Sequence, residues 1–337
     1  MGVQAGKVSI MIPTYNRAHY LNNAIESALS QDYRDIEIVI SDNGSIDGTR
    51  ELVKKYQHDS RLRYYRSETN LGSNANYGNL LYKYAQGQYG KYLTDDDYLI
   101  DRQHISKAMQ IIDKHGVKIV FSAAIAKFDQ TDEELNSCLE VGEVVEREWW
   151  LRNLCKVRKG VTVFPSCMSG VVFEIERAKN LNAFGKGQYY CDYDFAIKCI
   201  LMDEKVGYIN TASYVERQHR GQEGRTSFDY ARNGARIFDN VYEFGRQLGI
   251  ADAPLRRLRR RGLKFFARGY LVQNWINENG NSFRSLWDFL KELRALDRML
   301  PVVALTDAHT MVKFAFRNSV LYGMLRGTYL RLYHRKR

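Results

Sequence analysis

The sequence of 337 residues predicts an α/β fold, in which helices flank both faces of a mostly parallel sheet. Three observations support this prediction. Short apolar runs alternate with segments of helical periodicity through the first 125 residues. The connections between these segments are short, as in consecutive strand–helix–strand units. Polar motifs directly follow the apolar runs, where parallel sheets bind ligands beyond the carboxyl ends of their strands.

The predicted elements follow in order along the chain. Strands are predicted at 8–12, 36–40, 62–65, 91–94 and 118–123, with helices at 18–30, 47–56, 75–85 and 102–115. The pattern then loosens, with strands at 161–164, 171–174 and 207–215 and a helix at 194–202. From Phe228 onward the chain is predicted to be almost continuous helix, broken near 249–254, 279–282 and Pro301.

Positive charge is concentrated near the C-terminus. Residues 251–337 contain 18 Lys and Arg but 6 Asp and Glu, an excess that is larger than the net charge of +11 for the whole chain. This asymmetry favours an anionic partner for the C-terminal segment: phospholipid, nucleic acid or a phosphorylated acceptor. A solvated basic face without a partner is the alternative.

Cysteine usage and hydropathy limit the class of protein. The five cysteines are odd in number and form no CxxC pair, so we expect a reduced, intracellular protein. We expect no signal peptide, because an apolar strand follows the first residues directly. No run of 18 apolar residues occurs, so we expect no membrane span.

Three consecutive aspartates, Asp95, Asp96 and Asp97, follow the predicted strand at 91–94. Adjacent carboxylates repel one another unless a cation or hydrogen-bond donors compensate them. Mg²⁺ and Mn²⁺ prefer oxygen ligands and are often bound by one or two carboxylates together with substrate phosphates. The triad therefore favours a divalent cation site. The alternative is a solvated acidic turn that caps the next helix.

Three further polar motifs follow strands or precede helices. They are IPTYNR at 12–17, SDNGSIDGT at 41–49 and NLG at 70–72. Asp42 ends a strand, where its carboxylate can accept hydrogen bonds from a base or a ribose. Asn16 is expected to cap the helix that follows it. Each of these motifs is common by itself.

Taken in this order with the aspartate triad, the motifs resemble those of family 2 glycosyltransferases of the GT-A fold, over roughly residues 7–225. The chain is most similar to the branch that adds sugars to lipid-linked intermediates of bacterial surface polysaccharides, such as O-antigen. The resemblance implies an inverting transfer from a nucleotide-sugar donor to an acceptor hydroxyl, with Mn²⁺ or Mg²⁺ as cofactor. It implies donor-binding roles for Pro13, Thr14, Tyr15, Arg17, Asp42, Asn70, Gly72, Asp95 and Asp96, and a metal-binding role for Asp97. Many members carry a second aspartate where this chain has Asn43.

The resemblance also suggests where the catalytic base lies. The segment 188–195 is similar to the acidic base motif of the family, which makes Asp192 the candidate base and Asp194 the second choice. A helix cap at Asp192 is the alternative. In the segment 213–227, His219 is a candidate metal ligand. Arg217, Arg220 and Arg225 are candidates to pair with the diphosphate on a closing segment, unless the segment is a solvated basic loop.

We therefore expect a catalytic domain at 1–227, divided into a nucleotide-binding half at 1–125 and an acceptor half at 126–227. A basic helical extension would follow at 228–337. Amphipathic patterns at 255–270 and 310–337 favour binding to an anionic membrane surface, although the apolar sides would equally suit packing on the catalytic domain. The expected location is cytoplasmic, on the inner face of the cell membrane, with no nucleic acid partner.

Two other classes of protein remain open. A nucleotidyltransferase also binds nucleotides on an α/β sheet with a metal held by carboxylates, but it usually has a glycine-rich basic loop after the first strand, which IPTYNR is not. An inactive member of the same fold that binds membranes or polyanions is the second alternative.

Overall fold

The computed structural model describes residues 4–128, 134–158, 161–163, 168–181, 184, 191–219, 228–270, 291 and 294. The chain divides into two compact parts, one formed by residues 1–221 with 240–255 and the other by 222–239 with 256–337. The domain boundary at 227/228 stays a prediction.

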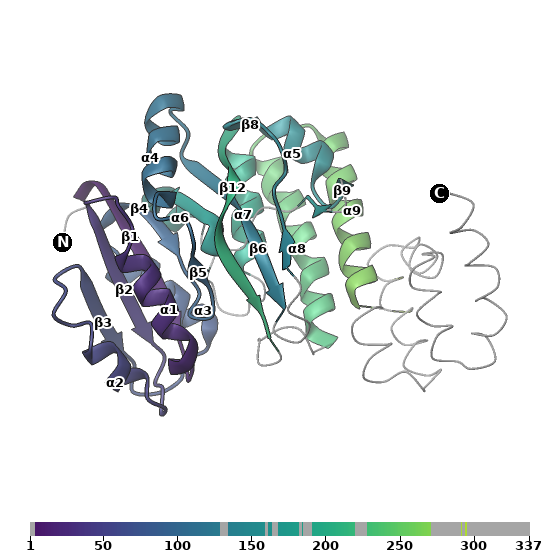
Figure 1. The fold of residues 1–337 in the computed structure, drawn as a ribbon. Coiled ribbons are helices and arrows are strands. Elements are labelled where there is room, and N and C mark those ends of the chain that lie inside the picture. The colour runs from purple at the N-terminus through teal and green to yellow at the C-terminus, as the bar shows by residue number, and fades with distance from the viewer. Residues whose placement is uncertain are drawn as a thin grey trace, which may run out of the picture. The chain divides into compact units, whose positions relative to one another are not determined.

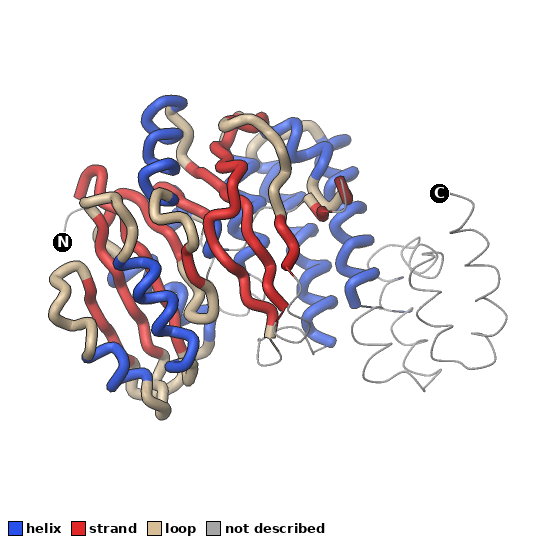
Figure 2. The backbone as a smooth tube through the Cα atoms, viewed as in Figure 1, coloured by secondary structure: helices blue, strands red, loops and turns tan. Residues whose placement is uncertain are grey.

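The first part is built on one mixed sheet (Figures 1 and 2). Its strands are β1 (Gln4–Thr14), β2 (Ile36–Asp42), β3 (Leu62–Arg66), β4 (Gly87–Tyr92), β5 (Tyr98–Leu99), β6 (Ile119–Phe128), β7 (Glu134–Asn136), β8 (Val144–Glu146), β11 (Val171–Glu174) and β12 (Lys205–Gln218). The order is β3-β2-β1-β4-β11-β6-β12-β5, while β7 pairs with β6 and β8 with β12. The short strands β9 (Val157–Arg158) and β10 (Val161–Thr162) form a separate pair.

Strand direction brings the polar motifs to one edge of this sheet. β3, β2, β1 and β4 are mutually parallel, and β6 is parallel to β12. β11 lies antiparallel between β4 and β6, so β6 runs in the direction of β4. The predicted mostly parallel sheet is confirmed. The antiparallel strands β5, β7 and β8 were not predicted, because two or three residues are too few to establish a period.

The helices connect these strands. They are α1 (Ala18–Leu29), α2 (Thr49–Lys54), α3 (Ser73–Asn79), the π-helical turn η1 (Leu80–Tyr84), α4 (His104–His115), α5 (Arg147–Asn153), the 3₁₀ turn η2 (Met168–Gly170), α6 (Ile175–Asn180), α7 (Cys191–Met202), α8 (Phe228–Gln247) and α9 (Asp252–Tyr270). The predicted helix at 75–85 is therefore two pieces, because the chain changes to π-helical hydrogen bonding at Leu80.

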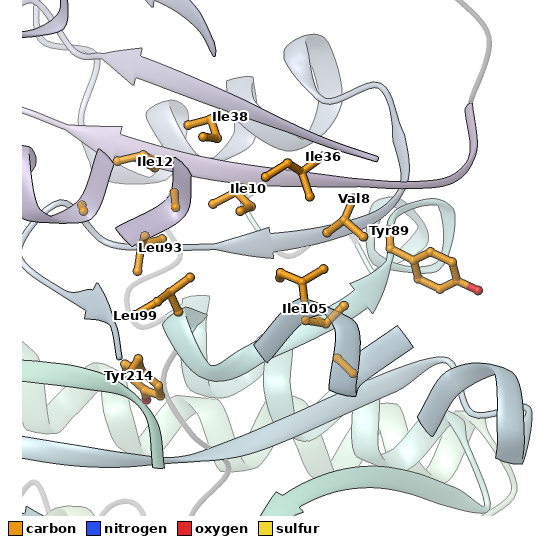
Figure 3. Close-up of a cluster of buried hydrophobic side chains, with 14 of the residues drawn as sticks. Val8, Ile10, Ile12, Ile36, Ile38, Tyr89, Leu93, Leu99, Ile105 and Tyr214 are labelled. Carbon is orange, nitrogen blue, oxygen red and sulfur yellow. The ribbon is translucent and has the colours of Figure 1, made fainter. Parts of the chain in front are cut away.

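The core between the sheet and its helices fixes the ends of β1 and β2. Val8, Ile10 and Ile12 point to one face of β1, as alternation in a strand requires, and each is fully buried (Figure 3). Leu21 and Ile25 of α1 belong to the same buried cluster, at the spacing of one helical face. The loops that follow these strands therefore begin from residues packed in the core.

Helix α9 has the amphipathic pattern expected from the sequence. Leu258 and Leu263 are buried, whereas Arg256, Arg257 and Arg260 are exposed. In the second part of the chain, Gly262 of α9 lies against the ring of Phe238 in α8, where an added Cβ would be 2.3 Å from ring atoms. Within the described residues no helix is long and apolar enough to cross a membrane. The pattern predicted at 310–337 lies outside the described residues.

Candidate active site

The candidate site lies at the carboxyl ends of β1, β2 and β4. Thr14 and Asp42 end adjacent parallel strands and are register partners. The aspartate triad follows β4, and its three residues are only 3–4 % exposed. A solvated turn that caps a helix is therefore wrong, because the triad is buried and the next helix begins at His104, with Gln103 as its N-cap.

Two cationic or potentially cationic side chains meet the first two aspartates. The Arg17 Nη1 atom donates to Asp95 Oδ1 at 3.1 Å and to Asp96 Oδ2 at 2.9 Å. His219 Nε2 lies 3.1 Å from the same Asp96 oxygen. Arg17 comes from the IPTYNR motif and His219 directly follows β12, so segments more than 200 residues apart in the chain meet at the triad.

The three carboxylates differ in their proton affinities. Burial and the charge of Asp96 raise the pKa of Asp95 to about 6. Burial and the charges of Asp96 and Glu216 raise the pKa of Asp97 well above its usual range. Burial acts in the same direction on Asp96, but the hydrogen bond with His219 and the charge of Arg17 outweigh it and lower its pKa. Asp96 is thus the carboxylate that the protein itself neutralises.

Asp97 receives two uncharged donors. The hydroxyl of Ser169 donates to Asp97 Oδ2 at 2.6 Å, and the backbone N–H of Arg217 donates to Asp97 Oδ1 at 3.1 Å. Ser169 belongs to the 3₁₀ turn η2 and is fully buried. Sequence reasoning missed Ser169, because a single serine before an apolar strand carries no distinguishing pattern.

The residues present fit a divalent cation. Buried carboxylate oxygens are the ligands that Mg²⁺ and Mn²⁺ prefer, and a cation would offset the repulsion that raises the pKa values of Asp95 and Asp97. Among the described residues no group of three or more His, Cys, Asp or Glu side chains is arranged to bind a metal ion. Divalent cations are also bound by one or two carboxylates together with substrate phosphates. The metal-binding roles predicted for Asp97 and His219 stay predictions.

Arg217 lies at the end of β12, and its side chain is stacked between aromatic rings. Its guanidinium carbon is 5.1 Å from the ring centroid of Tyr20 and 4.9 Å from that of Tyr98. The Tyr20 ring is also 4.8 Å from the His219 ring. Tyr20 of α1 therefore contacts both candidate residues of this strand end. The other two arginines predicted here, Arg220 and Arg225, lie outside the described residues.

Asp42 is fully buried at the end of β2 and is hydrogen-bonded within the protein. Its Oδ1 accepts from the backbone N–H of Ser45 at 2.8 Å, and its Oδ2 accepts from the Tyr64 hydroxyl at 2.5 Å. Arg66 Nε lies 3.6 Å from Oδ2. These contacts fix the carboxylate in orientation. Its predicted contact with the base stays a prediction, as do those of the neighbouring Pro13, Thr14 and Tyr15.

Asn43 connects the loop after β2 to the NLG motif. Its Nδ2 donates to Asn70 Oδ1 at 2.8 Å and to the Gly72 carbonyl at 3.2 Å, while its Oδ1 accepts from Leu71 N–H at 2.9 Å. The amide uses both its donor and its acceptor here, which a carboxylate could not do. This network accounts for asparagine rather than aspartate at this position. Asn70 and Gly72 thereby acquire a structural role beside their predicted contact with the donor.

Asn16 does not cap α1 as expected. Arg17 occupies the N-cap position, and its side chain makes no capping hydrogen bond to the helix. The Asn16 backbone is left-handed, with φ of 53°, a conformation that asparagine tolerates better than most residues. Its Oδ1 instead accepts from the backbone N–H of Ile46 at 2.8 Å, and Asp47 Oδ2 accepts from Ala18 N–H at 3.0 Å. The loops after β1 and β2 are therefore bonded to each other.

The two candidate bases lie in the first turn of α7. Asp194 is 4 % exposed, and its Oδ2 accepts from Lys198 Nζ at 2.6 Å. Asp192 is half-buried, and burial raises its pKa. Phe195 anchors this helix, because its ring packs 4.9 Å from that of Phe173 in β11. The roles of the two aspartates stay predictions.

Solved structures of GT-A glycosyltransferases have the same fold. The structure of Staphylococcus aureus TarS residues 1–349 with UDP-GlcNAc matches with a TM-score of 0.66 and 18 % identity, over 94 % of this chain and 92 % of that chain. The mannosyltransferase PcManGT from Pyrobaculum calidifontis, solved with GDP-Man and Mn²⁺, matches with a TM-score of 0.54 and 16 % identity, over 93 % and 86 %. At these identities the likeness shows the fold, and the fold class is GT-A.

The family follows from the sequence match. The model of Glycosyl transferase family 2 matches residues 9–177, which is half of the chain. The chain belongs to this family, as its motifs suggested.

Two curated relatives show how far the similarity extends. The Campylobacter jejuni GalNAc(5)-diNAcBac-PP-undecaprenol beta-1,3-glucosyltransferase is 38 % identical over 96 residues, which cover 28 % of this chain and 31 % of that relative. The Streptococcus pneumoniae glycosyltransferase GlyG is 25 % identical over 237 residues, which cover 68 % of this chain and 78 % of that relative. The chain thus matches less than a third of the length of the Campylobacter relative.

Proposed function

We propose that this protein is an inverting, metal-dependent glycosyltransferase that moves a sugar from a nucleotide-sugar donor to an acceptor hydroxyl. The observation that carries the proposal is the buried aspartate triad at the carboxyl ends of β1, β2 and β4, in a chain of glycosyltransferase family 2. Burying three adjacent carboxylates is costly unless a cationic ligand compensates them. A cluster of buried charges that is unfavourable for folding is typical of a functional site.

The donor would bind across the strand ends. Asp97 would hold Mn²⁺ or Mg²⁺, which would supply Lewis-acid stabilisation of the departing diphosphate, while Asp95 would contact the nucleotide. Arg17 is within hydrogen-bonding distance of both Asp95 and Asp96, so it is close enough to contact the same diphosphate. Thr14 and Tyr15 would line the base pocket beside Asp42.

Asp192 would take the acceptor proton. Direct displacement at the anomeric carbon requires a base on the acceptor side, and the resulting stereochemistry is inversion. Burial raises the pKa of Asp192, which makes its carboxylate a stronger base. Asp194 is less suited to this role, because one of its oxygens is paired with Lys198.

The acceptor class we propose is a lipid-linked saccharide. The Campylobacter relative is named for an undecaprenol-linked substrate, and TarS is a poly(ribitol-phosphate) beta-N-acetylglucosaminyltransferase. Exposed Arg256, Arg257 and Arg260 on α9 would attract the protein to an anionic membrane, at about 1 kcal/mol for each basic residue near the surface. The protein would then act at the cytoplasmic face of the cell membrane.

A donor screen tests the reaction. The purified chain would be incubated with UDP-, GDP- and dTDP-sugars, with Mn²⁺, Mg²⁺ or EDTA, and both thermal stability and donor hydrolysis would be measured. We expect metal-dependent stabilisation by one donor, which is lost in Asp97→Ala. Absence of a response from the folded protein to any donor would contradict the proposal.

A second comparison tests the base. Asp192→Asn should lower the turnover number by about 100-fold or more with donor affinity nearly unchanged, since general base catalysis contributes about 10²–10⁴-fold. Asp194→Asn is the matched control on the same helical turn and should affect thermal stability more than turnover. Unchanged turnover in Asp192→Asn would remove Asp192 as the base.

Membrane association is tested with vesicles. The chain should sediment with vesicles that contain phosphatidylglycerol but not with pure phosphatidylcholine, and the triple variant R256E/R257E/R260E should lose that binding. Equal binding of the wild type and the triple variant would contradict the role of α9.

A further inference from the structure

The 3₁₀ turn η2 contacts the aspartate triad through one side chain. Ser169 is fully buried, and its hydroxyl donates to Asp97 Oδ2 at 2.6 Å. The two residues are 72 positions apart in the chain, so this contact exists only in the folded protein. No motif of the sequence includes Ser169. Its only hydroxyl proton is directed at the carboxylate for which we propose metal binding.

Ser169 is itself held in place from two sides. The backbone N–H of Thr94 donates to Ser169 Oγ at 3.1 Å, which directs the hydroxyl proton away from Thr94 and toward Asp97. The fully buried Lys91 donates from Nζ to the Ser169 carbonyl oxygen. Both Lys91 and Thr94 belong to the segment that leads into the triad. The position of Ser169 is therefore fixed relative to the strand that carries Asp97.

The donors to Asp97 leave it capable of binding a cation. Each carboxylate oxygen has two lone pairs, and one of each is used by Ser169 Oγ and by the backbone N–H of Arg217. The Thr94 side chain also hydrogen-bonds to this carboxylate, so at least one of its four lone pairs remains. Because these donors are uncharged, they orient the carboxylate without neutralising it. Asp95 and Asp96 differ in this respect, since both are paired with Arg17.

We infer that Ser169 is a positioning residue for the proposed metal ligand Asp97. This inference rests on the proposed function, because it requires a divalent cation at Asp97. Hydrogen bonds to a ligating carboxylate set its orientation, and loss of such a bond typically weakens metal affinity by about 10–100-fold.

The chain offers a matched control. Ser122 is also a buried serine, and its hydroxyl donates at 3.2 Å to the carbonyl of Gly170, the residue after Ser169. Ser122→Ala therefore removes a buried hydrogen bond to the same 3₁₀ turn without removing a donor to Asp97. A general loosening of this turn should affect Ser122→Ala and Ser169→Ala alike.

The experiment measures Mn²⁺ binding rather than turnover. Binding of Mn²⁺ to the full chain would be followed by electron paramagnetic resonance with UDP and, in parallel, with GDP. Nucleotide affinity in EDTA and the thermal unfolding midpoint would be measured for each variant. We expect Ser169→Ala to bind Mn²⁺ at least tenfold more weakly, Ser122→Ala to stay within twofold of the wild type, and nucleotide affinity in EDTA to be unchanged. Ser169→Cys, which keeps a weak donor, should lie between Ser169→Ala and the wild type and replaces Ser169→Ala if that variant does not fold.

Each other outcome has a distinct meaning. Mn²⁺ affinity in Ser169→Ala within twofold of the wild type would overturn the positioning role and leave the metal role of Asp97 intact. Equal weakening in Ser169→Ala and Ser122→Ala would also overturn it, in favour of a structural role for the turn. Failure of the wild type to bind Mn²⁺ with either nucleotide would overturn the metal dependence in the proposed function, and the inference with it.

Discussion

Asn76 of α3 holds the ends of β1 and β2 together, and its replacement by aspartate would put an acceptor in place of the donor of two hydrogen bonds. The side chain is 3 % exposed. Its Nδ2 donates to the Ser41 carbonyl at 3.0 Å and, more weakly, to the Thr14 carbonyl at 3.5 Å. Its Oδ1 accepts from the Ser41 hydroxyl at 2.6 Å. In Asn76→Asp the shape is unchanged, but an oxygen would face the Ser41 carbonyl.

The expected cost follows from these contacts and depends on pH. An unsatisfied buried acceptor costs about 1–3 kcal/mol, and a buried charge adds to that, so we expect a loss of about 2–4 kcal/mol at pH 8. When protonated, the carboxyl group can donate to the Ser41 carbonyl again. Burial raises the native pKa of the new carboxyl above its unfolded value of about 3.9. Relative stability is therefore highest at low pH and falls as the pH rises through the native pKa.

Urea unfolding of the wild type and of Asn76→Asp at pH 5 and pH 8 measures this difference. Asn23→Asp is the control, because it makes the same chemical change at an exposed position of α1 and should stay within about 0.5 kcal/mol of the wild type. An Asn76→Asp protein as stable as the wild type at pH 8 would refute the reasoning. So would a cost that does not decrease between pH 8 and pH 5.

Three further perturbations test other parts of the structure. Gly262→Ala should destabilise by about 1–3 kcal/mol in chemical denaturation, because its Cβ would overlap the Phe238 ring, although alanine normally favours helices. Burial lowers the pKa of Lys91 to about 7. The free energy of unfolding of the wild type should therefore rise relative to that of Lys91→Met between pH 7 and pH 10, by at most about 1.4 kcal/mol per pH unit. Parallel pH profiles of the two proteins would contradict this. Arg17→Ala should lower the free energy of unfolding by about 1–2 kcal/mol more than Arg17→Lys, because it leaves two buried carboxylates without their shared cation. Equal free energies of unfolding for the two variants would show that the ion pairs contribute nothing.

The parallel sheet was predictable because its signals are local. A buried parallel strand is a short apolar run, and the helix after it has a different period, so β1, β2 and β6 were found from neighbouring residues alone. The prediction was less accurate for helix ends, because tertiary hydrogen bonds decide where a helix begins. The predicted helix at 47–56 is shorter, at Thr49–Lys54, and its first backbone N–H, that of Thr49, donates to Asp47 in the preceding loop.

The candidate site was predictable in its motifs but not in its pairings. Asp42 and the triad were found because each follows a strand, and a parallel sheet brings such positions to one edge. The pairing of Asp96 with His219 and of Asp97 with Ser169 joins residues 123 and 72 positions apart. No local pattern encodes such contacts, because they depend on how β12 and η2 are placed in the sheet. Asn43 shows the same limit, since its network with Asn70 appears only when both loops are folded.

The three aspartates appear equivalent in the sequence, and their surroundings make them different. Arg17 bridges Asp95 and Asp96, and His219 adds a second contact to Asp96, so the protein supplies positive charge to the first two carboxylates. Asp97 is oriented by a hydroxyl and a backbone amide, neither of which is charged. A cation that enters this site therefore meets at Asp97 a carboxylate that is paired with neither Arg17 nor His219, while Arg17 limits the repulsion that would otherwise oppose burial of the triad. If this division is correct, replacing Arg17 affects chiefly the stability of the empty site, whereas replacing Ser169 affects chiefly its affinity for metal.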